Sequence, residues 1–181
     1  MEVHVTFLLL LAGVALFTTS SPRDAFHTVL HLVLLFTCVI LHEFGHALMA
    51  RRFGIATREI VLLPIGGVAR LERMPDKPVQ EILVAVAGPA VNVVLATIFG
   101  AALFSAHVSP ETILQRASGE GTLEFLLFAN VFMIAFNMIP AFPMDGGRVL
   151  RGALASFMPF TRATRIASLI GQGFALVFAA A

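Results

Sequence analysis

Two histidines and a glutamate stand close together in the segment 41–50, in the pattern His-Glu-x-x-His. His42 and His46 are four residues apart, so on a helix both imidazoles project from one face and can reach one metal ion. Glu43 lies beside them, where it can accept a proton from a water that the metal activates. The pattern predicts a hydrolytic zinc site. Because so short a pattern also arises by chance, interhelical hydrogen bonding of the histidines is the alternative.

The composition predicts an integral membrane protein. Of the 181 residues, 58% are hydrophobic and 13% are charged, and the mean hydropathy is +0.91. A soluble domain is about half apolar and about a quarter charged. The net charge of +1 gives no support to a nucleic-acid partner, and the single cysteine, Cys38, cannot form a disulfide within the chain.

The apolar segments predict an all-α polytopic fold in a single domain, residues 1–181. Five membrane spans are expected, at residues 3–17, 26–50, 79–106, 123–139 and from 166 to the end. A third of the way along the chain, residues 58–71 hold two β-prone runs around a Pro/Gly turn, which predicts a small β-hairpin at the membrane surface.

Two connections between the later spans are also predicted. Residues 109–121 are expected to form a short loop. Residues 137–148 contain two prolines and two glycines, so this stretch cannot continue as regular helix. A short helix is expected to follow it, from about residue 148 to residue 157.

The basic residues predict the orientation in the membrane. Ten of the twelve Lys and Arg residues fall in the connections after the second and fourth spans. By the positive-inside rule these connections, and the N-terminus, are expected in the cytoplasm. His42 and His46, in the last turns of the second span, are then expected towards the cytoplasmic face.

A catalytic site with two histidines needs a third protein ligand and leaves the fourth position to water. That ligand must come from the same side of the membrane, which leaves five carboxylates: Glu59, Glu72, Asp76, Glu81 and Asp145. The first four lie among cations, where solvated salt bridges are expected. Asp145 lies in irregular backbone directly after a span, which is tolerated where it lines a polar cavity. Asp145 is therefore the predicted ligand, and capping of a helix that begins at Gly146 is the alternative.

Three other polar residues of the second span are interpreted as structural. His27 and His31 repeat the four-residue spacing, but Thr28 stands where the glutamate would be. They are expected to be interfacial or core histidines. Cys38 precedes His42 by one helical turn and could approach the metal, but a lone membrane cysteine is usually a small packing residue.

Four motifs in this order resemble the site-2 protease family of intramembrane zinc metalloproteases. They are HEFGH at 42–46, LPIGG at 63–67, GPAVN at 88–92 and NMIPAFPMDGG at 137–147. The resemblance extends from about residue 1 to residue 175. It implies one zinc ion held by His42, His46 and Asp145, with Glu43 as the general base.

The same resemblance implies a substrate-binding role for four further residues: Asn92, Asn137, Gly66 and Gly67. The 55–71 region would present an edge strand to an unwound substrate segment. For the two asparagines, packing amides are the alternative.

The short loop between the third and fourth spans matches family members without a PDZ domain. Many such relatives add a sixth span and C-terminal CBS modules, so the full-length protein is expected to have six spans.

The resemblance also implies a partner and a location. Relatives cleave transmembrane proteins such as membrane-bound transcription regulators or anti-sigma factors. The expected location is a prokaryotic cytoplasmic membrane, with contacts to substrate and lipid bilayer. The competing functional class is a zinc or proton transporter that uses the same ligands, for which Glu43 would not be required.

Overall fold

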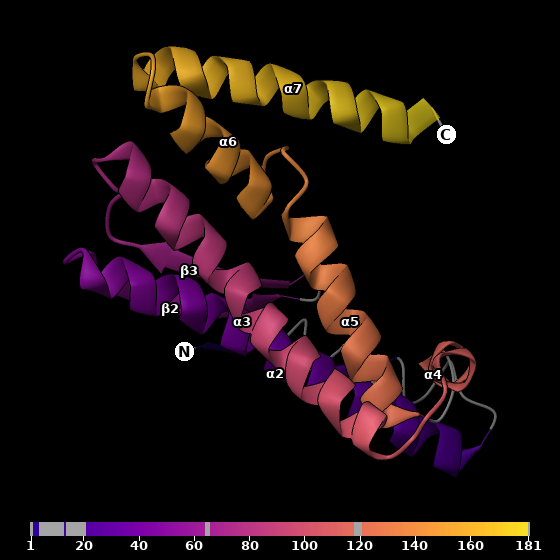
Figure 1. Cartoon of the computed structure of the whole chain (residues 1–181). Helices are drawn as coiled ribbons and strands as arrows, with labels where there is room; N and C mark the ends of the chain where they lie inside the picture. The colour runs from indigo at the N-terminus through magenta and orange to yellow at the C-terminus, as the bar shows by residue number, and fades with distance from the viewer. Residues whose placement is uncertain (1, 4–12, 14–20, 64–65, 118–120, 181) are drawn as a thin grey trace.

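The computed structural model describes residues 2–3, 13, 21–63, 66–117 and 121–180, and it is mostly helical (Figure 1). Three strands and six helices follow one another within these residues: β1 (Glu2–Val3), α2 (Pro22–Arg52), β2 (Thr57–Leu63), β3 (Gly66–Leu71), α3 (Pro78–Ser105), α4 (Pro110–Ala117), α5 (Thr122–Asn137), α6 (Asp145–Ala155) and α7 (Phe160–Ala180).

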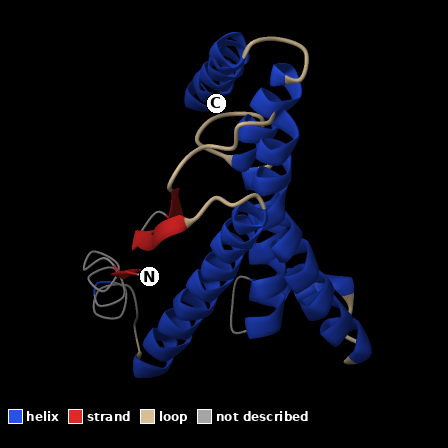
Figure 2. Cartoon of the chain, turned by 90° about the vertical axis from the view of Figure 1, so that its left-hand side faces the viewer, coloured by secondary structure: helices blue, strands red, loops and turns tan. Residues whose placement is uncertain are grey.

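Helices α2, α3 and α5 pack against one another and form the body that holds the site (Figures 1 and 2). The start of α2 follows from its sequence: Ser21 Oγ accepts a hydrogen bond from the Asp24 amide at 3.2 Å, and Pro22 occupies the first turn. Arg51 and Arg52 lie in its last turn, where cations interact favourably with the helix dipole.

Two of the described helices, α2 and α3, are long and apolar enough to cross a membrane, and a third span results if the bent pair α4 and α5 counts as one. The segment 3–17 lies almost wholly outside the described residues. The apolar segment from residue 166 is part of α7, which is not among these candidates. The predicted count of five spans therefore stays a prediction.

Two local predictions were wrong. Residues 109–121 were expected to form a loop, but they contain α4, a short helix that packs against α5. The helix expected from residue 148 begins at Asp145 instead. Gly146 and Gly147 lie inside the first turn of this helix, where they pack against the backbone of residues 138–142.

The strands lie together on one side of the helices (Figure 2). They form one sheet in the order β1-β2-β3, with β1 parallel and β3 antiparallel to β2. Residues 64–65, which connect β2 to β3, lie outside the described residues. The predicted hairpin and its place at the membrane surface stay predictions.

A buried cluster fixes the end of α2 against α3, close to the site. Ala50, Ile55 and Val84 are all at most 2% exposed, and Met49, Phe53 and Leu71 pack around them. The turn after α2 is thus packed against the helix that carries the GPAVN motif.

Candidate metal centre

The three predicted ligands meet at one point between α2 and the start of α6. His42 Nε2 and His46 Nε2 are 3.0 Å apart, and Asp145 Oδ2 lies 3.2 Å from each of them. The three side chains are buried, at 4%, 4% and 7% exposure. Together they form a group that can hold a metal ion.

The hydrogen bonds of the two imidazoles leave a lone pair on each Nε2. His46 Nδ1 lies 2.7 Å from the main-chain oxygen of Val84, and His42 Nδ1 lies 2.5 Å from Asn92 Oδ1. Since both partners are acceptors, both Nδ1 atoms donate, and the Nε2 atoms are free to bind a metal. Both acceptors belong to α3, so this helix orients the ligands that α2 supplies.

The donor set fits zinc. Two Nε2 lone pairs and the Asp145 carboxylate face one another, an arrangement that a bound metal ion would make favourable. Asp145 Oδ2 is buried and accepts no hydrogen bond from any residue that the structure describes. Zinc with bonds of about 2.0–2.1 Å in tetrahedral geometry holds its ligand atoms about 3.3 Å apart, close to the spacing found here.

Two glycines let α3 approach this centre. A Cβ atom on Gly88 would overlap His46 Nε2 and lie 2.7 Å from His42 Nε2, and one on Gly45 would lie 2.6 Å from the Ala87 oxygen. The space beside Gly88 is occupied by the two metal-facing imidazoles.

Asp145 is held by the fold of the segment before α6. The N-cap of α6 is Met144, and Asp145 is the first helical residue, so the alternative in which Asp145 caps this helix was wrong. A Cβ on Gly146 would overlap the Ile139 oxygen, and one on Gly147 would lie 2.7 Å from the Ala141 carbonyl carbon. The two glycines therefore let the irregular segment 138–142 fold directly against the turn that carries Asp145.

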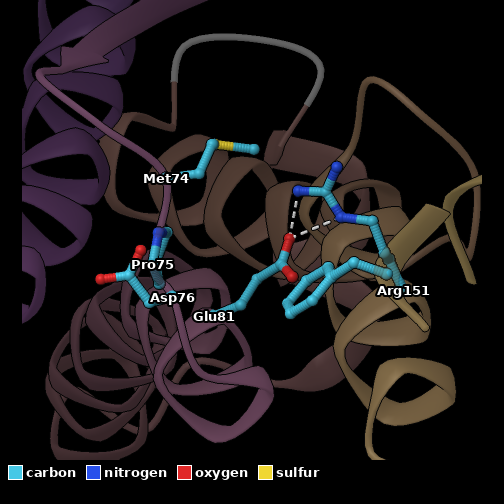
Figure 3. A pocket seen from close by; sticks show the side chains of 6 residues that line it. Met74, Pro75, Asp76, Glu81 and Arg151 are labelled. Carbon is cyan, nitrogen blue, oxygen red and sulfur yellow. Dashed lines mark hydrogen bonds and ion pairs between the residues drawn. The ribbon is translucent and has the colours of Figure 1, made fainter. Parts of the chain in front are cut away.

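A buried ion pair joins α3 to α6 next to that turn (Figure 3). Arg151 Nε donates to Glu81 Oε1 at 2.7 Å, and a second guanidinium nitrogen contacts the same oxygen. The guanidinium also lies over the Phe142 ring, 5.3 Å from its centroid.

The prediction of a solvated carboxylate was wrong for Glu81, which is 3% exposed because α6 covers it. Glu72 and Asp76 do form exposed pairs, with Arg58 and Arg73.

Arg151→Met is expected to reduce zinc retention. It leaves Glu81 as a buried charge without its partner, which costs about 3–5 kcal/mol, and it releases the contact that ties Phe142 and α6 to α3. The matched control is Arg73→Met, since the exposed pair of Arg73 with Asp76 is worth only about 0–1 kcal/mol. Zinc content after dialysis and the unfolding temperature in detergent are the measurements. Equal zinc retention by both variants would contradict the role of the pair.

The remaining predicted residues have other surroundings. Glu43 is half-buried and follows His42 on α2. Asn137 Nδ2 donates to the Met133 oxygen of its own helix at 3.0 Å. Gly66 and Gly67 begin β3, opposite Leu63 and Leu62. The substrate contacts of Asn92, Asn137 and the two glycines stay predictions.

The second histidine pair has structural contacts. His31 stacks on Phe125, with ring centroids 4.5 Å apart, and its Nε2 lies 3.2 Å from Thr122 Oγ1. His27 packs edge-on against Phe26. These contacts favour the structural interpretation.

Asn130 was not among the predicted site residues, yet it is fully buried and hydrogen-bonded to Asn92. The one signal was an amide inside the apolar stretch 123–139, since such a group must find a partner in a membrane.

Comparison with known proteins agrees with this centre. Residues 30–120 and 106–178 match peptidase family M50. The chain belongs to peptidase family M50. The predicted resemblance to site-2 proteases is confirmed, because a site-2 protease from Methanocaldococcus jannaschii has a similar structure. Its TM-score is 0.68 at 34% identity, over 97% of this chain and 76% of that one.

Two curated relatives are also similar in sequence to this M50 chain. A zinc metalloprotease of Methanocaldococcus jannaschii is 35% identical over 97% of this chain and 49% of its own length. Stage IV sporulation protein FB of Bacillus subtilis is 30% identical over 92% of this chain and 52% of its own length. The chain thus spans about half the length of these relatives. The first relative is named a zinc metalloprotease. Zinc is therefore the metal that we assign to the group of His42, His46 and Asp145.

Proposed function

We propose that this chain is the single-domain core of an intramembrane zinc metalloprotease, which hydrolyses a peptide bond within or near a transmembrane segment of a membrane-bound substrate. The observation that carries the proposal is the convergence of His42, His46 and Asp145, with Glu43 beside them on α2. Membership of peptidase family M50 and the likeness to a site-2 protease support it.

The residues divide the reaction between them. His42, His46 and Asp145 hold zinc, which supplies Lewis-acid activation of a water and of the scissile carbonyl. Glu43 is the general base: it accepts a proton from the attacking water and then delivers it to the leaving nitrogen. The water oxygen first bonds to the carbonyl carbon, and the carbon–nitrogen bond then breaks as the nitrogen takes up the proton from Glu43. The products are a carboxylic acid and an amine, and the second proton of the water passes from the acid to the amine to give a carboxylate and an ammonium group.

The substrate is proposed to bind next to β3 and the loop that follows α5. β3 is an outer strand of the described sheet, so its free edge can pair with an extended segment. Gly66 and Gly67 begin that strand, while Asn137 ends α5. In this proposal Asn137 and the two glycines line the path of an unwound substrate.

The proposed location is a prokaryotic cytoplasmic membrane, crossed several times, with the N-terminus and the site towards the cytoplasm. The grouping of basic residues after the second and fourth apolar segments supports this orientation. The proposed partner is a transmembrane protein such as a membrane-bound transcription regulator or anti-sigma factor, met within the lipid bilayer.

The test is cleavage in proteoliposomes. The purified chain is combined with a library of candidate single-span membrane proteins, and mass spectrometry identifies the products. We expect cleavage within or beside the membrane segment, lost with a zinc chelator and restored when zinc is added back. Products that form equally in the presence of the chelator would contradict the proposal.

A further inference from the structure

A chain of buried amides continues from His42 away from the metal centre. Asn92 Oδ1 accepts from His42 Nδ1 at 2.5 Å, and Asn92 Nδ2 donates to Asn130 Oδ1 at 2.8 Å. Both asparagines are 0% exposed. The chain of hydrogen bonds joins α2 to α3 and α3 to α5.

The far end of this chain has a defined direction. Asn130 Nδ2 donates to the main-chain oxygen of Leu126 at 2.8 Å and to Cys38 Sγ at 3.4 Å. A main-chain oxygen can only accept, so Asn130 must turn its nitrogen towards Leu126 and its oxygen towards Asn92. Asn92 must then donate to Asn130 and present its own oxygen to His42.

The two metal-facing histidines differ in what orients them. The acceptor for His46 is the Val84 carbonyl, which belongs to the backbone of α3 and has no donor to offer. The acceptor for His42 is a side-chain amide, which presents an acceptor or, if reversed, a donor. A reversed Asn92 would draw the proton of His42 to Nε2 and block the lone pair that faces Asp145.

We propose that Asn130 is a positioning residue that acts through Asn92 to hold His42 in the tautomer that binds the metal. Asn130 does this by accepting from Asn92 Nδ2, which prevents the Asn92 amide from reversing. The inference rests on the proposed zinc site, and it gives Asn92 a role in orienting a ligand.

The readout is the dissociation constant for zinc, measured on the full chain in detergent by competition with a fluorescent chelator. Asn130→Leu removes the close acceptor of Asn92 Nδ2 and leaves the weaker contact to Met133 Sδ at 3.7 Å. We expect zinc to bind about 10–100-fold more weakly, as is typical when the partner of a metal-binding histidine is lost. Asn130→Ala removes the same amide with a smaller side chain and serves if the leucine variant does not fold.

A second substitution separates orientation from packing. In the Asn92→Asp, Asn130→Leu double variant, both carboxylate oxygens accept, so His42 Nδ1 has an acceptor whichever way the side chain turns. We expect this double variant to recover most of the zinc affinity lost by Asn130→Leu. If Asn130 only packs α5 against α3, the double variant stays as weak as the single one, and the proposal is overturned.

Cys38→Ala is the matched control within the same cluster. It removes one acceptor of Asn130 Nδ2 but leaves the Leu126 oxygen, so the direction of the chain and the zinc affinity should stay unchanged. Weakening by Cys38→Ala equal to that by Asn130→Leu would overturn the proposal.

His42→Ala separates failure of the positioning role of Asn130 from failure of the proposed zinc site. If neither the natural chain nor His42→Ala binds zinc, the proposed function fails as well. If His42→Ala abolishes zinc binding while Asn130→Leu leaves it unchanged, only the positioning role is overturned.

Discussion

Glu43→Gln is expected to abolish peptide hydrolysis while zinc stays bound. The substitution keeps the size of the side chain but removes its ability to accept and return a proton. General-base catalysis of this kind contributes about 10²–10⁴-fold to the rate. The three ligand atoms come from His42, His46 and Asp145, so zinc content should equal that of the natural chain. Product formation in proteoliposomes and zinc content of the purified variant are measured side by side.

The same variant separates a protease from a transporter. A zinc or proton transporter built on the same ligands needs no general base, so Glu43→Gln should leave its flux intact. Glu72→Gln is the matched control, because Glu72 is an exposed glutamate paired loosely with Arg58 at 4.0 Å. Cleavage by Glu43→Gln at the rate of this control would remove Glu43 from the mechanism.

Gly88→Ala is expected to remove both zinc and cleavage. The added methyl group would overlap His46 Nε2 and lie 2.7 Å from His42 Nε2, so it would occupy the space beside the ligand atoms. The rings cannot move away without losing their hydrogen bonds to Val84 and Asn92. Loss of such orienting bonds alone weakens metal binding about 10–100-fold.

Gly100→Ala is the control for this prediction. Gly100 lies on the same helix, and among the described residues a Cβ there meets only Leu127 Cδ1, at 3.8 Å, which is ordinary contact. This variant should retain zinc and activity, and circular dichroism should show equal helix content in both. Zinc bound by Gly88→Ala as tightly as by Gly100→Ala would show that the glycine is not needed at the metal centre.

Much of the site could be predicted because it depends on the spacing of residues within single segments of the chain. The four-residue spacing of His42 and His46 needs only a helix to bring both rings to one face. The helix α2 around them was predicted at 26–50 and is found at Pro22–Arg52, since a long apolar run with terminal polar residues specifies such an element locally. Counting charges left five carboxylates on the side of the membrane where His42 and His46 were expected. The irregular backbone around Asp145, directly after a span, then selected it among them.

Other features depend on which distant segments pack together. The buried pair of Glu81 with Arg151 could not be read from the sequence, because Glu81 resembles its solvated neighbours until α6 covers it. The role of Asn130 is hidden for the same reason, since its partners lie on α3 and α2 as well as on its own helix.

The residue types of the site could be read from the sequence: two imidazoles, a carboxylate and a neighbouring glutamate, in an apolar chain. Their support comes from the tertiary structure. It placed Gly88 against the two rings, turned Asp145 inward from the first turn of α6, and supplied Val84 and Asn92 as acceptors. The physical reason is that residue spacing encodes the direction of a side chain along its own helix, whereas its partners depend on how separate helices pack.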